Sequence, residues 1–219
     1  MNKGIRGVLQ QIKLFFILYL VILAACLVIK FLFSRTDIFF AVNNRYSDWA
    51  DLIAPYLTDL GNGWTILIFS AIIALFNYRI AFLLATTYGM TSIFAQVIKH
   101  IVNAPRPKLF FHNQLSHIHF VKGLYIDTLG SFPSGHTVTA FSIAVVITYL
   151  CKNKNWGIPL LIIAILIGFS RMYLSEHFFE DVVGGSVIGV IVSVIWLTWL
   201  DNKRFLHTPA WNKGLIKRQ

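Results

Sequence analysis

The chain has 219 residues, of which 57% are hydrophobic and 13% are charged, and its mean hydropathy is +0.68. Soluble domains carry about 25% charged residues, so this composition excludes an ordinary soluble enzyme and a disordered chain. The length suits about six membrane-spanning helices with short loops. In so apolar a chain, the formal net charge of +10 favours cationic loops on the inner side of a membrane over a nucleic-acid partner.

Six apolar runs, separated by charged breaks, predict the helices. A transmembrane helix needs about 20 apolar residues, and the second, fourth and fifth runs reach that length only with semi-polar flanking residues. We expect an all-α polytopic membrane protein, a bundle of six transmembrane helices with an interfacial segment between the first two. The runs are Leu14–Phe33, Leu60–Phe76, Ile80–Ile98, Thr137–Cys151, Trp156–Phe169 and Val182–Leu200.

The first run follows three cations, as in a signal peptide, and Leu23–Cys26 within it resembles a lipoprotein cleavage box. Because the apolar run continues past Cys26 to Phe33, we expect a retained anchor rather than a cleaved leader. Cys26 and Cys151 both lie in apolar stretches, where they predict small buried or lipid-facing side chains and no disulfide framework.

The charges between the runs predict the orientation in the membrane. With the N-terminus inside, the inner segments hold eleven Lys and Arg residues and one acid, Asp201, whereas the outer segments hold eight cations and eight acids. The positive-inside rule then places both termini in the cytoplasm, and we expect a bacterial inner-membrane protein. We expect one domain over residues 1–201 and a basic cytoplasmic tail over 202–219, either on the anionic leaflet or solvated.

Two outer segments are long. Ser34–Asp59 mixes charges with aromatic residues and predicts an interfacial helix or loop. Its aromatic anchors are Tyr46, Trp49 and Tyr56. The other segment is Lys99–Ser134, and its loop Lys108–Gly130 contains three histidines whose spacing alone is weak evidence for a metal site. A wet polar loop explains them as well. These histidines are His112, His117 and His119.

Ionisable residues at membrane level are costly and mark functional sites, and here they form three clusters on the outer side. The first cluster ends the third run, where Pro105 and Pro107 break the helix and put Arg106 in a loop. This lets Arg106 and Lys99 face one point. Taken alone, the segment fits two boundary cations that extend to lipid headgroups better than it fits a site.

The second cluster opens the fourth run. Ser134 is placed to cap the helix, so that the backbone N–H groups of Gly135 and His136 point outward as an anion site. Gly135 lets a ligand approach the backbone closely, and His136 adds a proton donor. The alternative is a simple cap followed by a buried histidine.

The third cluster joins the fifth and sixth runs and adds a third cation, Arg171. His177 and Asp181 are four residues apart, so on a helix they would share a face and hydrogen-bond, which would fix the imidazole tautomer. One alternative is a structural His–Asp pair. Another is a metal site of His177, Glu180 and Asp181, which the cationic neighbours disfavour.

Together the clusters supply three fixed cations, a helix N-terminus, two histidines and one orienting carboxylate. A phosphate group, with a charge of about −1.5 to −2 and three acceptor oxygens, suits such a site. Phosphoryl transfer also needs a nucleophile and a leaving-group acid, and His177 and His136 can fill these roles. The sequence has neither a Walker loop nor an acidic magnesium cluster, which argues against a nucleotide substrate.

The clusters resemble the three signature motifs of the type 2 phosphatidic acid phosphatase family, the integral-membrane lipid phosphatases. The matching segments are Lys99–Pro107, Pro133–His136 and Ser170–Asp181, and no motif position departs from the pattern. The resemblance implies a six-helix bundle in which His177 attacks phosphorus to form a phosphohistidine. It further implies that Asp181 orients His177, that His136 protonates the leaving oxygen, and that no metal or other cofactor is needed. The residues implied to hold the phosphoryl group are Lys99, Arg106, Ser134, Gly135 and Arg171.

Two functions stay open at this point. The first is a metal-independent lipid phosphatase at the extracytoplasmic face, acting on a lipid such as undecaprenyl pyrophosphate, phosphatidylglycerol phosphate, phosphatidic acid or lipid A. The second is a non-enzymatic membrane protein that binds or transports a phospholipid. The motifs specify a phosphoryl group, but they identify neither the lipid tail nor the oligomeric state.

Overall fold

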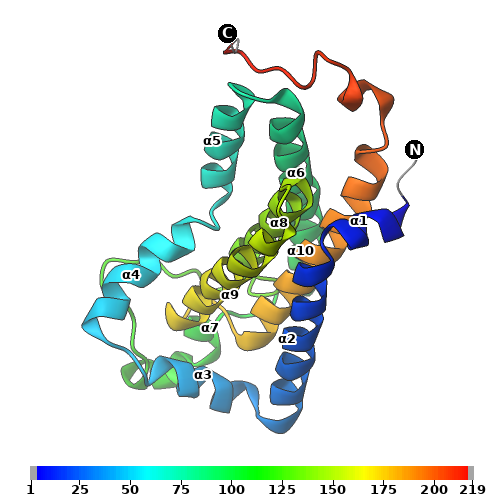
Figure 1. Ribbon diagram of the computed structural model, residues 1–219. Coiled ribbons are helices and arrows are strands. Elements are labelled where there is room, and N and C mark those ends of the chain that lie inside the picture. Colours follow the sequence, from blue (N-terminus) through cyan, green and yellow to red (C-terminus); the bar gives the residue numbers. More distant parts are fainter. Residues whose placement is uncertain (1–3, 217–219) are drawn as a thin grey trace.

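The computed structural model describes residues 4–216, and every regular element in that range is a helix (Figure 1). Three cations of the charge count, Lys3, Lys217 and Arg218, lie outside the described residues. The α-helices are α1 (Ile5–Gln11), α2 (Lys13–Leu32), α3 (Arg35–Asn43), α4 (Asp48–Asp59), α5 (Gly63–Ala74), α6 (Tyr78–Val102), α7 (Pro107–Phe110), α8 (Gly135–Leu150), α9 (Gly157–Tyr173) and α10 (Phe179–Leu200). Short 3-10 helices cover His112–His117, Lys154–Trp156 and Arg204–His207.

The predicted apolar runs correspond to α2, α5, α6, α8, α9 and α10. Among the described residues, four helical segments are long and apolar enough to cross a bilayer. They are α2, α6 together with α7, α9 together with the 3-10 helix before it, and α10. Helices α4 and α5 pass the same test only as a pair bent by 55°, and α8 has 16 residues, or about 24 Å of helix. The all-α membrane fold is confirmed, whereas the count of six spans stays a prediction.

Local signals fix where α6 begins and ends. The side chain of Asn77 accepts a hydrogen bond from the backbone N–H of Ile80 at 3.0 Å and so caps the first turn. At the other end, Asn103 adopts a left-handed conformation with φ of 39°, and Pro105 prevents a further turn. As the prolines predicted, Arg106 lies in the connection between α6 and α7.

The interfacial segment forms helices α3 and α4. Trp49 and Tyr56 are 69% and 70% exposed, as expected of membrane anchors. Tyr46 is exposed as well, and its ring stacks on His119 with 3.9 Å between the ring centroids. His119 also lies 2.8 Å from a carboxylate oxygen of Asp51, so it attaches the long outer loop to α4. Within residues 4–216, no three His, Cys, Asp or Glu side chains are grouped as a metal site.

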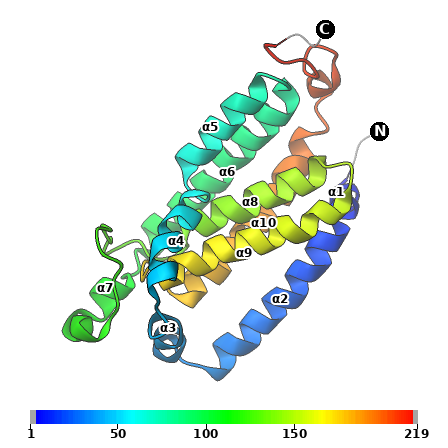
Figure 2. The same ribbon diagram turned by 60° about the vertical axis from the view of Figure 1, so that its left-hand side comes forward.

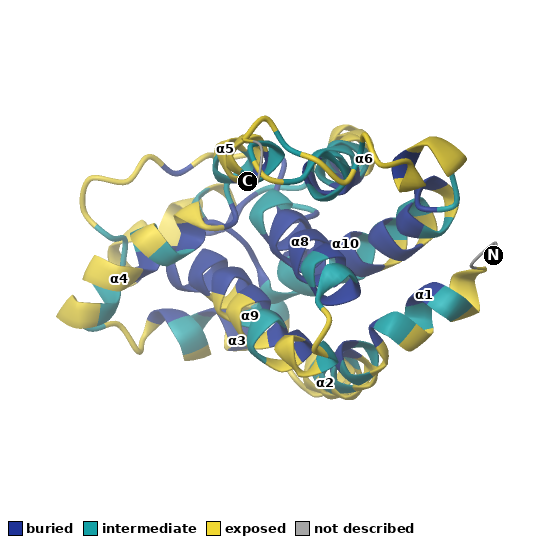
Figure 3. Ribbon diagram, turned by 45° about the horizontal axis from the view of Figure 1, so that its top comes forward, coloured by how far each residue is buried: buried dark blue, intermediate teal, exposed yellow. Residues whose placement is uncertain are grey.

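Helix α8 is at the centre of the bundle, packed against α6, α9 and α10. Nearly all of its side chains from Thr137 to Tyr149 are buried, whereas exposed residues concentrate on the outer helices (Figure 3). The outer helices present large apolar groups such as Phe31, which is 90% exposed. This distribution suits a bundle surrounded by lipid, in which only the central helix is enclosed by protein.

The described chain ends lie at one end of the bundle, and α3 and α7 lie at the opposite end (Figure 2). At the first end, Asp201 accepts hydrogen bonds from Arg79 at 2.7 Å and from Tyr149 at 2.6 Å, which connects α10 to α6 and α8. The tail folds back over the turn between α5 and α6, where Tyr78 N donates to Lys213 O. The boundary predicted at residue 201 stays a prediction.

Close packing of α10 on α8 depends on Gly189. A Cβ atom at this position would lie 2.6 Å from the carbonyl oxygen of Val138 and 3.1 Å from Cβ of Phe141. A backbone oxygen cannot move aside as the end of a flexible side chain can. Any side chain at residue 189 must therefore push α10 away from α8.

We expect Gly189→Ala to destabilise the protein by about 1–3 kcal/mol through overpacking, measured as a lower melting temperature of the detergent-purified protein. The matched control is Gly89→Ala in α6, because a Cβ there would meet no described heavy atom within 4 Å. Alanine is the better helix former, so the control should be neutral or stabilising. Equal melting temperatures for the two variants would contradict the proposed close packing.

Candidate active site

A cavity of about 450 Å³ lies where the C-terminal ends of α6 and α9 meet the N-terminal ends of α8 and α10. Six of the eight residues predicted for the site line it, whereas Ser134 and Asp181 are buried behind its wall. The six are Lys99, Arg106, Gly135, His136, Arg171 and His177. The structure therefore brings together three sequence clusters that are separated along the chain by more than a helix length.

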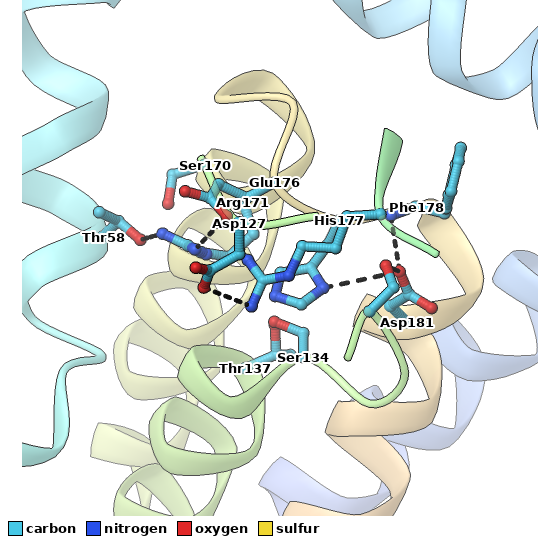
Figure 4. A network of polar contacts seen from close by, with 12 residues as sticks. Thr58, Asp127, Ser134, Thr137, Ser170, Arg171, Glu176, His177, Phe178 and Asp181 are labelled. Carbon is cyan, nitrogen blue, oxygen red and sulfur yellow. Dashed lines mark hydrogen bonds and ion pairs between the residues drawn. The ribbon is translucent and has the colours of Figure 1, made fainter. Parts of the chain in front are cut away.

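His177 faces Asp181, but from the connection between α9 and α10 rather than from a helix. Nδ1 of His177 lies 3.5 Å from Oδ2 of Asp181 and has no hydrogen-bond partner among the described residues (Figure 4). The prediction that both residues share a helical face is wrong. The reason is that Asp181 caps α10, accepting a hydrogen bond from the backbone N–H of Phe178 at 2.8 Å, so the helix begins after His177.

Asp181 also joins the second cluster to the third. The hydroxyl of Ser131 donates to its Oδ2 atom, and the backbone N–H of Ser134 donates to its carbonyl oxygen at 3.0 Å. Burial of a carboxylate requires such donors. No role was predicted for Ser131, although a hydroxyl three residues before Ser134 was a visible candidate for this contact.

Ser134 precedes α8 as predicted, but its hydroxyl does not cap the helix. It accepts a hydrogen bond from the hydroxyl of Thr137 at 2.9 Å instead. The first N–H groups of a helix have no partner within the helix, so those of Gly135 and His136 stay available to a ligand. A Cβ at Gly135 would meet no described heavy atom within 4 Å, which shows that open space adjoins this backbone.

The two arginines are already paired with acids. Arg106 binds the carboxylate of Glu176 and lies 3.2 Å from that of Asp127. Arg171 donates to the hydroxyl of Thr58 at 2.8 Å and lies 3.5 Å from Glu176. Sequence reasoning missed Thr58, Asp127 and Glu176, all of which line the cavity. Of these three, only Glu176 could have been expected from the sequence. It is adjacent to His177 in the third cluster, and a buried cation such as Arg171 needs an anion nearby.

The environment of His177 suits a neutral imidazole. Burial lowers the pKa of His177 well below its ordinary value, and the charges of Arg171, Arg106 and Lys99 lower it further. An imidazole that is neutral near pH 7 has one unprotonated ring nitrogen. Because Nδ1 faces Asp181, Nε2 is the atom left to act as a nucleophile or base towards the cavity.

The alternative metal site does not assemble from the residues proposed for it. The carboxylate of Glu180 binds Arg35 and lies 3.5 Å from Lys30, and Glu180 does not line the cavity. Glu180 is therefore not placed to act as a third ligand beside His177 and Asp181, and the cavity that His177 lines also holds Lys99, Arg106 and Arg171. Such surroundings favour an anionic ligand in the cavity.

Comparison with known proteins identifies a family and several relatives of this chain. The family model described as PAP2 superfamily matches residues 80–205. Undecaprenyl-diphosphatase BcrC of Bacillus subtilis is 32% identical over 114 residues, which cover 52% of this chain and 56% of BcrC. Phosphatidylglycerophosphatase B of Bacillus subtilis is 28% identical over 158 residues, which cover 66% of this chain and 72% of that protein. The matched part of this chain thus spans little more than half the length of BcrC.

A solved structure shows the same arrangement of helices. The crystal structure of the first transmembrane PAP2 type phosphatidylglycerolphosphate phosphatase from Bacillus subtilis superposes with a TM-score of 0.64 at 26% sequence identity. The superposition covers 87% of this chain and 96% of that structure. The superposed part of the chain is therefore larger than residues 80–205, which the family model matches.

Thr58 of α4 positions Arg171, and its removal tests that contact. We expect Thr58→Val to leave one guanidinium N–H without its partner and to raise the dissociation constant for inorganic phosphate about fivefold, which corresponds to about 1 kcal/mol, the order of one hydrogen bond. Equilibrium binding of radiolabelled phosphate to the purified protein measures this change. Thr58→Ser keeps the hydroxyl and should restore the affinity, so weak binding by both variants would contradict the assigned role.

Proposed function

The chain belongs to the PAP2 superfamily, and from this premise we propose that it removes phosphate from a membrane lipid phosphate or diphosphate through a phosphohistidine intermediate. The observation that carries the proposal is the position of His177. One side of its imidazole faces Asp181 at 3.5 Å, and the residue lines a cavity shared with Lys99, Arg106 and Arg171. A nucleophile, its orienting carboxylate and the cations for a phosphoryl group thus meet in one place.

In the proposed reaction, Nε2 of His177 attacks phosphorus while the bond from phosphorus to the leaving oxygen breaks. His136, which also lines the cavity, gives a proton to that oxygen. Asp181 stabilises the positive charge that develops on the imidazole. Water then attacks the phosphohistidine while the bond from phosphorus to Nε2 breaks, and His136 takes a proton back from this water. Inorganic phosphate leaves, and both histidines return to their starting states.

The remaining predicted residues hold the phosphoryl oxygens in this proposal. Arg171 is suited to the task because its buried Nε atom has no partner among the described residues. The N–H groups of Gly135 and His136 add the partial positive charge of a helix N-terminus. Ser134 contributes indirectly, since its backbone N–H joins the start of α8 to Asp181. Stabilisation of this kind usually dominates phosphoryl transfer.

We propose that the cavity faces the extracytoplasmic side of a bacterial inner membrane, with both termini in the cytoplasm. The uneven distribution of charges supports this orientation, since among the described residues the segments at the end opposite the cavity hold eight Lys and Arg residues and one acid, Asp201. The substrate is then a lipid whose phosphate projects from the outer leaflet. Relatives named for undecaprenyl diphosphate and for phosphatidylglycerophosphate support a lipid of this class.

The direct test is phosphate release from a panel comprising undecaprenyl pyrophosphate, phosphatidylglycerol phosphate, phosphatidic acid and lipid A. We expect at least one lipid to be hydrolysed and His177→Ala to reduce its release by about 10⁴-fold or more, because the nucleophile is lost. Lipid binding, measured by cosedimentation with vesicles, should persist in the variant. A wild-type protein that binds these lipids and releases no phosphate would support the binding or transport alternative instead.

Removal of metal ions tests whether the proposed reaction proceeds without a metal. If histidine, arginine and lysine side chains alone carry the reaction, then dialysis against EDTA should change the rate of phosphate release by less than about twofold, since no Lewis acid contributes. Activity that falls with EDTA and returns with a divalent cation would contradict the proposed mechanism.

A further inference from the structure

Glu176 occupies a position that the proposed mechanism does not explain. Its carboxylate lines the phosphate cavity and is 11% exposed. The same oxygen atom, Oε2, accepts a hydrogen bond from Nη1 of Arg106 and lies 3.5 Å from Nη2 of Arg171. Figure 4 shows Glu176 and Arg171 on one side of His177 and Asp181 on the other.

These contacts set the carboxylate in competition with a phosphoryl group. A carboxylate and a phosphate use the same guanidinium N–H groups, so the two anions cannot both occupy them fully. Arg106 has little capacity in reserve, because its Nε donates to Leu129 O at 3.1 Å and its Nη2 faces Asp127. Two anions held this close also repel each other.

Glu176 also stabilises the two arginines when no phosphoryl group is bound. Arg106 and Arg171 are 7% and 6% exposed, and two such guanidinium groups repel each other unless an anion lies between them. Glu176 supplies that anion and keeps both side chains at the cavity. Asp127 cannot replace it, because its side chain is 57% exposed and pairs with Arg106 alone.

We propose that Glu176 is a built-in competitor for phosphate, a residue that holds Arg106 and Arg171 ready in the empty site and limits the affinity for the phosphate product. This inference depends on the proposed function, because it assumes that phosphate binds between these arginines. During turnover the incoming phosphoryl group displaces the carboxylate from the guanidinium groups. The carboxylate then returns to them when inorganic phosphate leaves.

The test compares the affinity of the purified full-length protein for radiolabelled inorganic phosphate before and after Glu176→Gln. The amide has nearly the same shape and no charge, so we expect the dissociation constant to fall about tenfold, as loss of one charged competitor allows. The matched control is Glu180→Gln, which removes an equal charge from an acid that does not line the cavity. For the control we expect a change of less than about twofold, since the Glu180 carboxylate is paired with Arg35 and Lys30 and contacts neither cavity arginine.

A second variant keeps the test decisive if Glu176→Gln does not fold. Glu176→Asp retains the charge but is one methylene too short to reach both arginines, so its phosphate affinity should lie between those of wild type and Glu176→Gln. An unchanged or higher dissociation constant in either Glu176 variant, or an equal decrease in Glu180→Gln, overturns the proposal. If wild type hydrolyses lipid phosphates and the Glu176 variants do not bind phosphate more tightly, only this inference fails. Absence of hydrolysis by wild type would instead count against the proposed function.

Discussion

Asp181 holds together the parts of the molecule on which the site depends. Its carboxylate accepts hydrogen bonds from Ser131 and from the backbone of Phe178, and its carbonyl oxygen accepts one from Ser134. These contacts fix the start of α8 relative to the start of α10 and leave His177 in the connection that faces the cavity. A buried carboxylate without those donors would cost several kcal/mol, so the surrounding loops are constrained to supply them.

Close packing of two helices makes this arrangement possible. A Cβ atom at Gly185 would lie 2.8 Å from the carbonyl oxygen of Ser134, so only glycine lets the first turn of α8 approach α10 this closely. The same contact region places three cations and three acids, Asp59, Asp127 and Glu176, around one cavity. Arg106, Arg171 and Glu176 are buried among these groups, and burial of charge is costly for stability, which marks the cavity as a functional site.

The sequence predicted the helices and the clusters of polar residues better than it predicted the contacts between individual side chains. Apolar runs predicted the ends of six helices to within a few residues, because hydrophobicity along a run is a local property that the sequence shows directly. Spacing gave the wrong geometry for His177 and Asp181, since helix capping by Asp181 competed with a shared helical face. The contact of Thr58 with Arg171 joins residues 113 positions apart, and no local pattern encodes such a pair. Glu176 was visible, but its partners follow only from tertiary packing.

The central claim is that a phosphoryl group binds within this cavity and is transferred to His177. Rapid quenching of the protein with a lipid substrate carrying ³²P in the terminal phosphate, followed by peptide mapping, tests it most directly. The account predicts an acid-labile, base-stable label on the peptide that contains His177. Label on another residue, or steady phosphate release with no labelled protein at any time, would contradict it.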